Sequence, residues 1–331
     1  MDITVVGAGI AGLTCALALA ERGAAVEVID RGTELGAASC SWLAGGMLAP
    51  WCELESAEAA VAELGVEALA YWVERFPGTI KNGSLVVAQP RDLSELSRFA
   101  SRTREFEWQD GNGIAALEPD LAGRFGRAMF FPREAHLDPR LALAELAKRL
   151  GILDVSIRFG VDAEKDHPNS GVIVDCRGMA ACSALADLRG VKGEMVIVRT
   201  HEINLQRPIR LLHPRHPLYI VPRGDGLFMI GATMVESDER HRVTARAVLE
   251  LLGAAYALHP AFAEAEVIEF GADVRPAFPD NLPRIRKVGS TIHVNGLFRH
   301  GFLLAPALAK RAAAFILDDA YFPEVMDENY L

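Results

Sequence analysis

The sequence predicts an α/β fold in which a doubly wound domain of parallel strands alternates along the chain with an α+β domain built on an antiparallel sheet. Three observations predict this fold. A strand, a glycine-rich turn, a helix and a second strand fill the first 30 residues. An apolar run typical of a buried parallel strand ends at a glycine within residues 170–185. Strand candidates crowd residues 193–278.

Length and composition support this fold and exclude several classes of function. The chain has 331 residues, 50% of them hydrophobic, which is enough for a sizeable core and about two domains. A net charge of -10 without a basic cluster argues against nucleic-acid binding. Five cysteines without a C-x-x-C pair indicate neither a disulfide framework nor a zinc site. Because no signal peptide or spanning segment is found, we expect a cytoplasmic protein that does not enter a membrane.

The first thirty residues predict one βαβ unit whose second strand ends on Asp30. Gly7, Gly9 and Gly12 fit the spacing G-x-G-x-x-G. The first glycine permits a tight turn, the second lets a pyrophosphate approach the backbone, and the third lets helix and strand pack closely. The helix N-terminus then faces the phosphates, and Asp30 stands where a carboxylate accepts hydrogen bonds from a ribose hydroxyl. The unit therefore predicts a Rossmann-like, dinucleotide-binding domain.

The dinucleotide could be NAD or FAD, and the segment from Gly36 to Pro50 favours FAD. Its sequence, GAASCSWLAGGMLAP, places small residues and paired glycines shortly after the ribose-binding strand. Such backbone can wrap closely around a bulky cofactor that stays bound. The alternative is an ordinary flexible loop.

The remaining elements are predicted from hydrophobic periodicity and turn residues. Helices are expected over 57–76, 92–104 and 245–257, and another begins where Asp138 is a candidate N-cap and Pro139 the first helical residue. Strands are expected over 83–89, 127–132, 193–200, 208–213, 218–223, 227–233 and 266–278. A last strand, 291–298, leads into an alanine-rich helix that starts near Gly301. The absence of linkers means that the two domains are interleaved or tightly joined.

Four later segments follow the glycine motif in order: AGGMLAP, LYIVPRGDGLFMIGATM, VRPAFPDNLP and NGLFRHGFLLAPAL. With them the chain resembles the D-amino-acid oxidase superfamily from its first strand to its last helix, and within it the bacterial glycine oxidases of thiamine biosynthesis. The resemblance implies an FAD flavoenzyme that oxidises a small amine or amino acid. It also implies an FAD-binding domain made of residues 1–78, 132–188 and 286–331 and a substrate domain made of residues 79–131 and 189–285.

The resemblance further implies the site residues. Arg275 matches the arginine that binds the substrate carboxylate, and Tyr219 the tyrosine that hydrogen-bonds the same group. Arg299 matches a basic residue beside substrate and flavin, and Met234 an apolar pocket residue. His300 stands where relatives have a different polar residue, so its role stays open. The implied FAD contacts are Gly7, Gly9, Ile10, Ala11, Gly12, Asp30, Arg31, Ala44, Gly45, Gly46, Met47, Leu297, Phe298, Arg299, His300, Gly301, Phe302 and Leu303.

Amine oxidation on a flavin is first a positioning problem, because the substrate α-hydrogen must lie about 3 to 3.5 Å from flavin N5. An arginine fixes a carboxylate through two parallel hydrogen bonds, and a tyrosine adds another. The lone pair of the neutral amine drives hydride departure, so we expect no side-chain nucleophile and no obligatory general base. A helix starting near Gly301 would stabilise negative charge on the reduced ring. Oxygen then becomes hydrogen peroxide, and by resemblance the imine passes to a thiazole synthase or is hydrolysed.

Several alternatives stay open. One is a flavin dehydrogenase, or an oxidase for sarcosine, proline or D-amino acids. Another is a flavoprotein that modifies a macromolecule, although the acidic charge disfavours tRNA. A non-catalytic FAD-binding protein is least favoured, because it would have no use for a paired arginine and tyrosine. His213 and His216 have the spacing H-x-x-H, but two prolines in this segment argue against a metal site. A homo-oligomer stays open as well.

Overall fold

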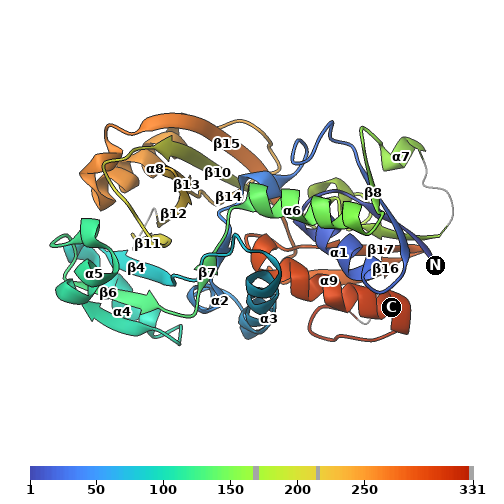
Figure 1. Cartoon of the computed structure of the whole chain (residues 1–331), viewed down its shortest axis with the longest axis horizontal. Helices are drawn as coiled ribbons and strands as arrows, with labels where there is room; N and C mark the ends of the chain where they lie inside the picture. The colour runs from blue at the N-terminus through green and yellow to red at the C-terminus, as the bar shows by residue number, and fades with distance from the viewer. Residues whose placement is uncertain (167–170, 214–216, 328–331) are drawn as a thin grey trace.

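The computed structural model describes residues 1–166, 171–213 and 217–327, and two sheets organise it, one toward each end of the elongated molecule (Figure 1). The first sheet has the order β16-β17-β9-β1-β2-β8, and neighbouring strands are parallel except β16 and β17. This parallel core confirms the predicted α/β class. The strands are β1 Asp2–Val6, β2 Ala25–Asp30, β8 Ser156–Phe159, β9 Val172–Asp175, β16 Arg284–Val288 and β17 Thr291–Asn295.

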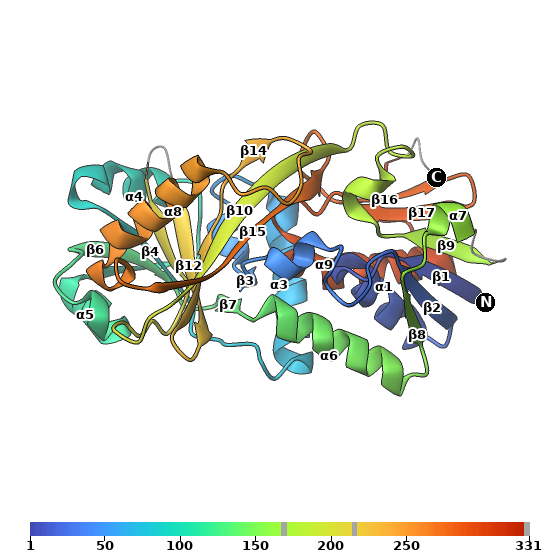
Figure 2. The same cartoon turned by 90° about the horizontal axis from the view of Figure 1, so that it is seen from above.

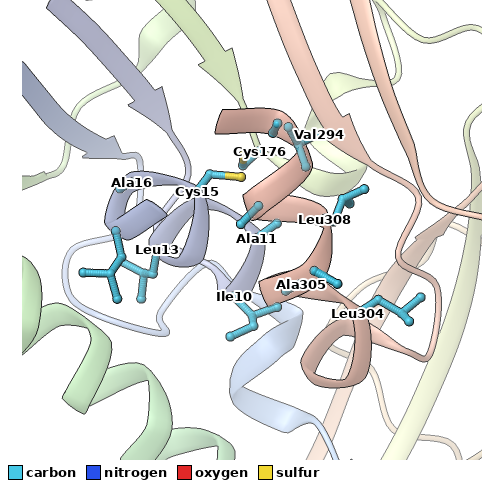
Figure 3. Packing of buried hydrophobic residues seen from close by; sticks show 14 of the residues in the cluster. Ile10, Ala11, Leu13, Cys15, Ala16, Cys176, Val294, Leu304, Ala305 and Leu308 are labelled. Atoms are coloured by element: carbon cyan, nitrogen blue, oxygen red, sulfur yellow. The ribbon is translucent and has the colours of Figure 1, made fainter. Parts of the chain in front are cut away.

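Two helices from opposite ends of the chain form the centre of the core beside this sheet. They are α1 (Ile10–Ala20) and α9 (Gly301–Asp318), and Figure 3 shows their apolar side chains interleaved. Small residues such as Ala11 and Ala305 let the two helices approach closely. Two further helices pack on this pair, α3 (Ala59–Arg75) on α9 and α6 (Pro139–Ile152) on α1.

The second sheet has the order β14-β10-β13-β12-β11-β4-β6-β5. Its ninth strand, β15, lies outside this order and pairs antiparallel with β10. The predicted antiparallel pairing is confirmed at most positions, but it is wrong for β11 and β4, which are parallel. These two strands come from separate stretches of chain, so no hairpin forces them to run in opposite directions. The strands are β4 Ser84–Ala88, β5 Glu107–Asp110, β6 Arg127–Phe131, β10 Arg189–Arg199, β11 Ile209–Leu212, β12 Leu218–Gly224, β13 Leu227–Gly231, β14 Val235–Glu236 and β15 Glu266–Ala277.

Shorter elements complete the chain. Figure 2 shows α4, α5 and α8 at the end that holds the second sheet, α7 at the other end, and β3 and β7 between them. Asp138 caps α6 as predicted, because its Oδ1 accepts hydrogen bonds from the backbone of Arg140 at 2.7 Å and Leu141 at 3.3 Å. The helix predicted over 92–104 ends earlier, at Ala100, where the Ser101 hydroxyl donates to the carbonyl of Arg98. The remaining elements are α2 Pro50–Glu53, α4 Leu93–Ala100, α5 Gly111–Leu117, α7 Ala163–Asp166, α8 Ala245–Leu258, β3 Met47–Leu48 and β7 Ala135–His136.

No helix among the described residues is both long and apolar enough to cross a membrane.

Candidate functional site

A cavity of about 520 Å³ opens at the carboxyl ends of the parallel strands. Its wall includes residues that end or follow β1, β2, β9 and β17, among them Gly7, Asp30, Arg177 and Asn295. Strand β1 has β2 as its neighbour on one side and β9 on the other. The chain passes from β1 to β2 first and reaches β9 later, so the cavity lies where the strand order reverses. This is the position at which open α/β sheets bind nucleotides.

The glycine turn has the close packing that its sequence predicts. Gly7 has φ +107°, and a Cβ there would lie 2.9 Å from the carbonyl oxygen of Cys176. A Cβ on Gly12 would lie 1.7 Å from the carbonyl oxygen of Gly7, so only glycine lets α1 pack against the turn. Gly12 is therefore buried beneath the cavity, whereas Gly9, Ile10 and Ala11 line it. Gly9, at the N-cap of α1, has no side chain to cap the helix, and Ser41 Oγ accepts from the backbone nitrogen of Ile10 at 3.1 Å. The other amides of the first turn remain for an anionic ligand.

Asp30 ties the end of β2 to this turn. Its Oδ2 accepts a hydrogen bond from the backbone of Ala8 and its Oδ1 one from the backbone of Gly32, both at 2.6 Å. Asp30 and Arg31 line the cavity, and each carboxylate oxygen has capacity for a further hydrogen bond. The position therefore fits the predicted contact with a ribose hydroxyl.

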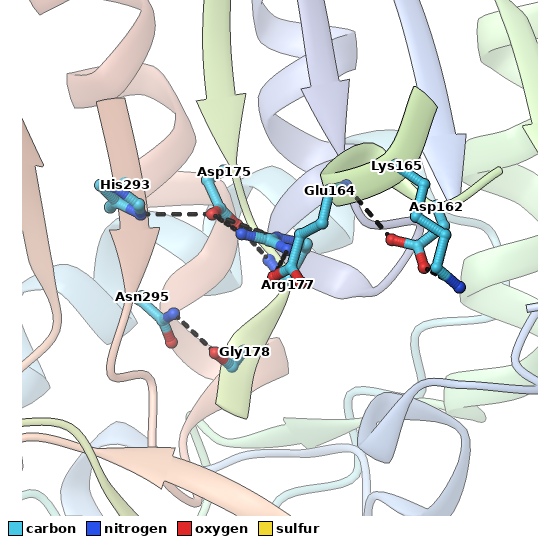
Figure 4. A network of polar contacts seen from close by, with 8 residues as sticks. All are labelled: Asp162, Glu164, Lys165, Asp175, Arg177, Gly178, His293 and Asn295. Carbon is cyan, nitrogen blue, oxygen red and sulfur yellow. Dashed lines mark hydrogen bonds and ion pairs between the residues drawn. The ribbon is translucent and has the colours of Figure 1, made fainter. Parts of the chain in front are cut away.

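The outer end of the cavity carries a charged network that sequence reasoning missed (Figure 4). Arg177 pairs with Asp175 at 2.8 Å and with Glu164 of α7 at 2.9 Å. Burial alone would raise the pKa of Asp175, but His293, whose Nδ1 lies 3.4 Å from Oδ2, and the hydrogen bonds from Arg177 outweigh it and lower the pKa to about 2. Asn295 donates to the carbonyl of Gly178 at 2.9 Å and so joins β17 to the loop after β9. These contacts hold α7 and the loop after β9 beside the cavity.

A second chamber of about 250 Å³ adjoins the first and shares part of its wall, including Gly45, Tyr219, Arg275 and Arg299. Met234 also lines this chamber but is 57% exposed, so it lies at the outer rim. Four predicted cofactor contacts line the second chamber and not the first: Gly46, Met47, His300 and Leu303. Leu297 and Phe298 line only the first cavity, as do Asp30, Arg31 and the contacts from the glycine turn other than Gly12. The structure thus brings the predicted substrate residues together at the inner end of the long cavity.

Tyr219 and Arg275 are held by their surroundings. The Tyr219 ring lies against two glycines, because a Cβ on Gly45 or Gly231 would come within 2.9 or 3.0 Å of it. Arg275 donates from Nη1 to the carbonyl of Thr233 at 3.1 Å. Both side chains come from strands of the second sheet, β12 and β15, which gives the chamber a rigid wall.

A buried ion cluster, missed from the sequence, forms the opposite wall. Glu53, at the end of α2, lies 2.5 Å from Nη2 of Arg210 and 2.7 Å from Nη2 of Arg299. Burial alone would raise the pKa of Glu53, but the two arginines outweigh it and hold the pKa far below its usual range. Burial lowers the pKa of His300 to about 4 despite the nearby Glu53, so His300 is neutral at pH 7.

The loop before α9 connects this cluster to Arg275. The strand predicted over 291–298 ends at Asn295, because Gly296, with φ +78°, turns the chain. Phe298 then donates from its backbone nitrogen to the carbonyl of Pro276 at 2.9 Å. His300 occupies the N-cap of α9 without a side-chain cap, so the first turn of α9 presents backbone amides at the chamber.

The glycine turn, the N-terminus of α1 and the long cavity fit an FAD molecule, with Asp30 and Arg31 at one end and residues 297–303 at the other. Within the described ranges, no group of three or more His, Cys, Asp or Glu side chains could hold a metal. The prediction that His213 and His216 do not form a metal site concerns a segment that includes His216, which lies outside the described residues.

Comparisons with known proteins agree with this geometry. The model of the family "DAO: FAD dependent oxidoreductase" matches residues 2–315. The chain is 56% identical to a Rhizobium etli protein named as the thiamine biosynthesis oxidoreductase ThiO, over 98% of this chain and 99% of that one. It is 28% identical to a glycine oxidase of Bacillus licheniformis, over 96% of this chain and 93% of that one.

Two further similarities bear on partners and fold. The chain is 27% identical to the bifunctional protein ThiO/ThiG of Synechocystis over 97% of its own length, and it spans 52% of that longer protein. The solved structure of glycine oxidase from Geobacillus kaustophilus matches with a TM-score of 0.81 at 23% identity, covering 99% of this chain and 98% of that one. Together with the cavity and its glycine turn, these matches show that the chain belongs to the family of FAD dependent oxidoreductases, with FAD as its cofactor.

Proposed function

We propose that this protein is an FAD-dependent glycine oxidase that supplies the imine of glycine for thiamine biosynthesis. The observation that carries the proposal is the convergence of Arg275, Tyr219 and Arg299 on a chamber that adjoins the cofactor cavity. The similarity to the ThiO protein and to the glycine oxidases supports it. When bound, FAD supplies the two-electron acceptor at N5, and oxygen is reduced to hydrogen peroxide.

The residues of the chain account for binding and orientation. Arg275 offers a planar guanidinium to the glycine carboxylate, and the Tyr219 hydroxyl adds a second point of attachment. The chamber wall carries four arginines, Arg98, Arg210, Arg275 and Arg299, against three carboxylates, Glu53, Glu55 and Glu95. The one positive charge in excess favours an anionic group. The amides of the first turn of α9 favour negative charge near the inner end of the cavity. No side chain has to abstract a proton from carbon.

The test is the Arg275→Ala variant, assayed for peroxide with glycine. We expect the glycine KM to rise by orders of magnitude while the purified protein keeps its FAD. Arg199→Ala is the matched control, because Arg199 lies on β10 of the same sheet and is 41% exposed in a pair with Glu266. An unchanged KM in Arg275→Ala would remove Arg275 from the site, and a wild-type protein without peroxide production on glycine would overturn the proposal.

A second substrate class is favoured by the size of the chamber. Its volume of about 250 Å³ leaves room beside a glycine molecule, and Met234 lies at its exposed rim. Sarcosine, proline and D-amino acids are therefore the alternative substrates. Turnover across this panel decides between them, and dye acceptors in place of oxygen distinguish an oxidase from a dehydrogenase.

We also propose that the imine passes to a thiazole synthase. The bifunctional ThiO/ThiG protein supports this, because in it a region similar to this chain is joined to a second part. Imine hydrolysis releases ammonia and glyoxylate, so an added thiazole synthase should lower glyoxylate release without lowering peroxide. The proposed FAD-binding stretches are 1–78, 132–188 and 286–331. They contain the strands of the six-stranded sheet except the first two residues of β16, Arg284 and Ile285, which supports that division apart from its last boundary.

A further inference from the structure

The side chain of Arg275 lies across the neighbouring strand, β10. β15 and β10 run side by side over most of their length (Figure 2), with Arg275 opposite Val191 and Gly193 at the diagonal position. A Cβ on Gly193 would lie 2.2 to 2.4 Å from Cζ, Nη1 and Nη2 of Arg275. The guanidinium therefore rests on the bare backbone of Gly193, and any larger residue would occupy its place.

Thr233 fixes one edge of the same guanidinium through its carbonyl, which accepts from Arg275 Nη1. Thr233 follows β13 and is bound to Glu194 of β10 by three hydrogen bonds. Its backbone nitrogen donates to the Glu194 carbonyl at 3.2 Å, and its hydroxyl donates to Glu194 Oε2 at 3.0 Å. The hydroxyl also accepts from the Glu194 backbone nitrogen at 2.9 Å. The carbonyl that orients Arg275 is thus itself held in place.

Glu194 is buried, and its charge is balanced within the fold. Its Oε1 accepts from the backbone nitrogen of Thr244 at 2.7 Å and lies 3.7 Å from Nζ of the buried Lys192. Lys192 in turn lies 3.1 Å from Glu239. Glu194 and Thr233 are not among the residues that line the two cavities, so neither can touch substrate directly. A satisfied buried network of this kind is rigid.

We infer that Gly193, Thr233 and Glu194 are positioning residues that set the orientation of the Arg275 guanidinium for the substrate carboxylate. The inference rests on the proposed function, in which Arg275 binds that carboxylate. A bidentate contact requires the plane of the guanidinium to be set in advance, and a displacement of 1 Å can cost roughly a hundredfold in rate. Glu194 and Thr233 therefore act on substrate binding through Arg275.

The test compares Thr233→Val with Thr233→Ser in the purified holoenzyme. Valine keeps the shape of threonine and removes the hydroxyl, whereas serine keeps the hydroxyl that binds Glu194. We expect Thr233→Val to raise the glycine KM at least fivefold, with a smaller change in kcat and unchanged FAD content. Thr233→Ser should stay within twofold of the wild-type KM. Gly193→Ala should raise KM as Thr233→Val does, and Gly253→Ala is its control, because a Cβ at Gly253 meets open space.

Arg275→Ala, measured in parallel, separates the two ways in which the inference can fail. If Arg275→Ala raises KM while Thr233→Val and Gly193→Ala stay within twofold of wild type, the positioning role is overturned and the proposed function stands. If Arg275→Ala leaves KM unchanged, the proposed substrate site and the positioning role are overturned together. If Gly193→Ala does not fold, the comparison of valine with serine at position 233 decides.

Discussion

Replacing Glu53 by glutamine should strongly destabilise the folded protein. The side chain of Glu53 is only 8% exposed, and it is paired with Arg210 and Arg299. Glutamine keeps the shape of the side chain and removes its charge, which leaves two guanidinium groups facing each other without a counter-ion. Removing one partner of a buried ion pair costs about 3 to 5 kcal/mol. Because the free energy of unfolding of a native protein is about 5 to 15 kcal/mol, this loss is a large share of it.

Urea unfolding followed by tryptophan fluorescence measures this loss. The control is Glu236→Gln, since Glu236 is 71% exposed and pairs with Arg189, so we expect a loss of about 0 to 1 kcal/mol. The low pKa of Glu53 in the folded state stabilises the protein above pH 4.5, the ordinary value, and this contribution disappears as the pH falls. The difference in free energy of unfolding between wild type and Glu53→Gln should therefore become smaller as the pH falls below 4.5.

Two results would refute this reasoning. A loss in Glu53→Gln no greater than in Glu236→Gln would show that the cluster does not stabilise the fold. The double variant Glu53→Gln, Arg210→Met should lose less than the sum of its two single variants, because removing both partners leaves fewer unpaired charges. A strictly additive loss would mean that Glu53 and Arg210 are not coupled.

Two further predictions concern a buried acid and the glycine turn. Burial raises the pKa of Glu134 to about 7, so its neutral form stabilises the fold below pH 4.5 and the contribution disappears as the pH rises through 7. Glu134→Gln keeps an acceptor for the backbone of Trp51 and Cys52 and should be more stable than wild type at pH 8, by up to about 3 kcal/mol, but not at pH 4.5. A difference in urea midpoint between Glu134→Gln and wild type that stays the same from pH 4.5 to pH 8 would contradict this prediction. Gly12→Ala should lower the FAD content of the purified protein at least tenfold, because its Cβ would clash with the carbonyl of Gly7, whereas Gly253→Ala should keep its flavin absorbance. Full flavin content in Gly12→Ala would contradict the packing argument.

The sequence predicted the parts of the site that depend on short-range geometry. The spacing of Gly7, Gly9 and Gly12 and the position of Asp30 follow from one βαβ unit, and the structure places them as that unit requires. The gathering of Tyr219, Arg275 and Arg299 is different, because these residues are far apart in sequence. Only the resemblance to a known family predicted that these three residues belong to one site.

Polar elements and buried ions escaped prediction for physical reasons. Strand β8 (SIRF) has only four residues and one of them is an arginine, and β16 (RIRKV) has three charged residues out of five. Both lack the apolar runs of the central strands. Glu53, Arg177 and Arg210 resemble surface residues when each is considered alone. Glu53 and Arg210 pair across 157 residues of sequence, and a single sequence does not record that pairing. Arg177 pairs with the buried Asp175 two positions before it, and its second partner, Glu164, comes from α7.

The cofactor cavity joins the beginning of the chain to its end, since Gly7 and Gly9 face a wall completed by residues 294–302. During synthesis the first βαβ unit emerges early, yet the loop after β17 and the helix α9 arrive last. The contacts that close the cavity are therefore among the longest in sequence separation, and the loop-closure entropy of such contacts slows folding. FAD that contacts both parts of this wall stabilises the folded chain, in which residues 294–302 lie beside the glycine turn, and not the unfolded one.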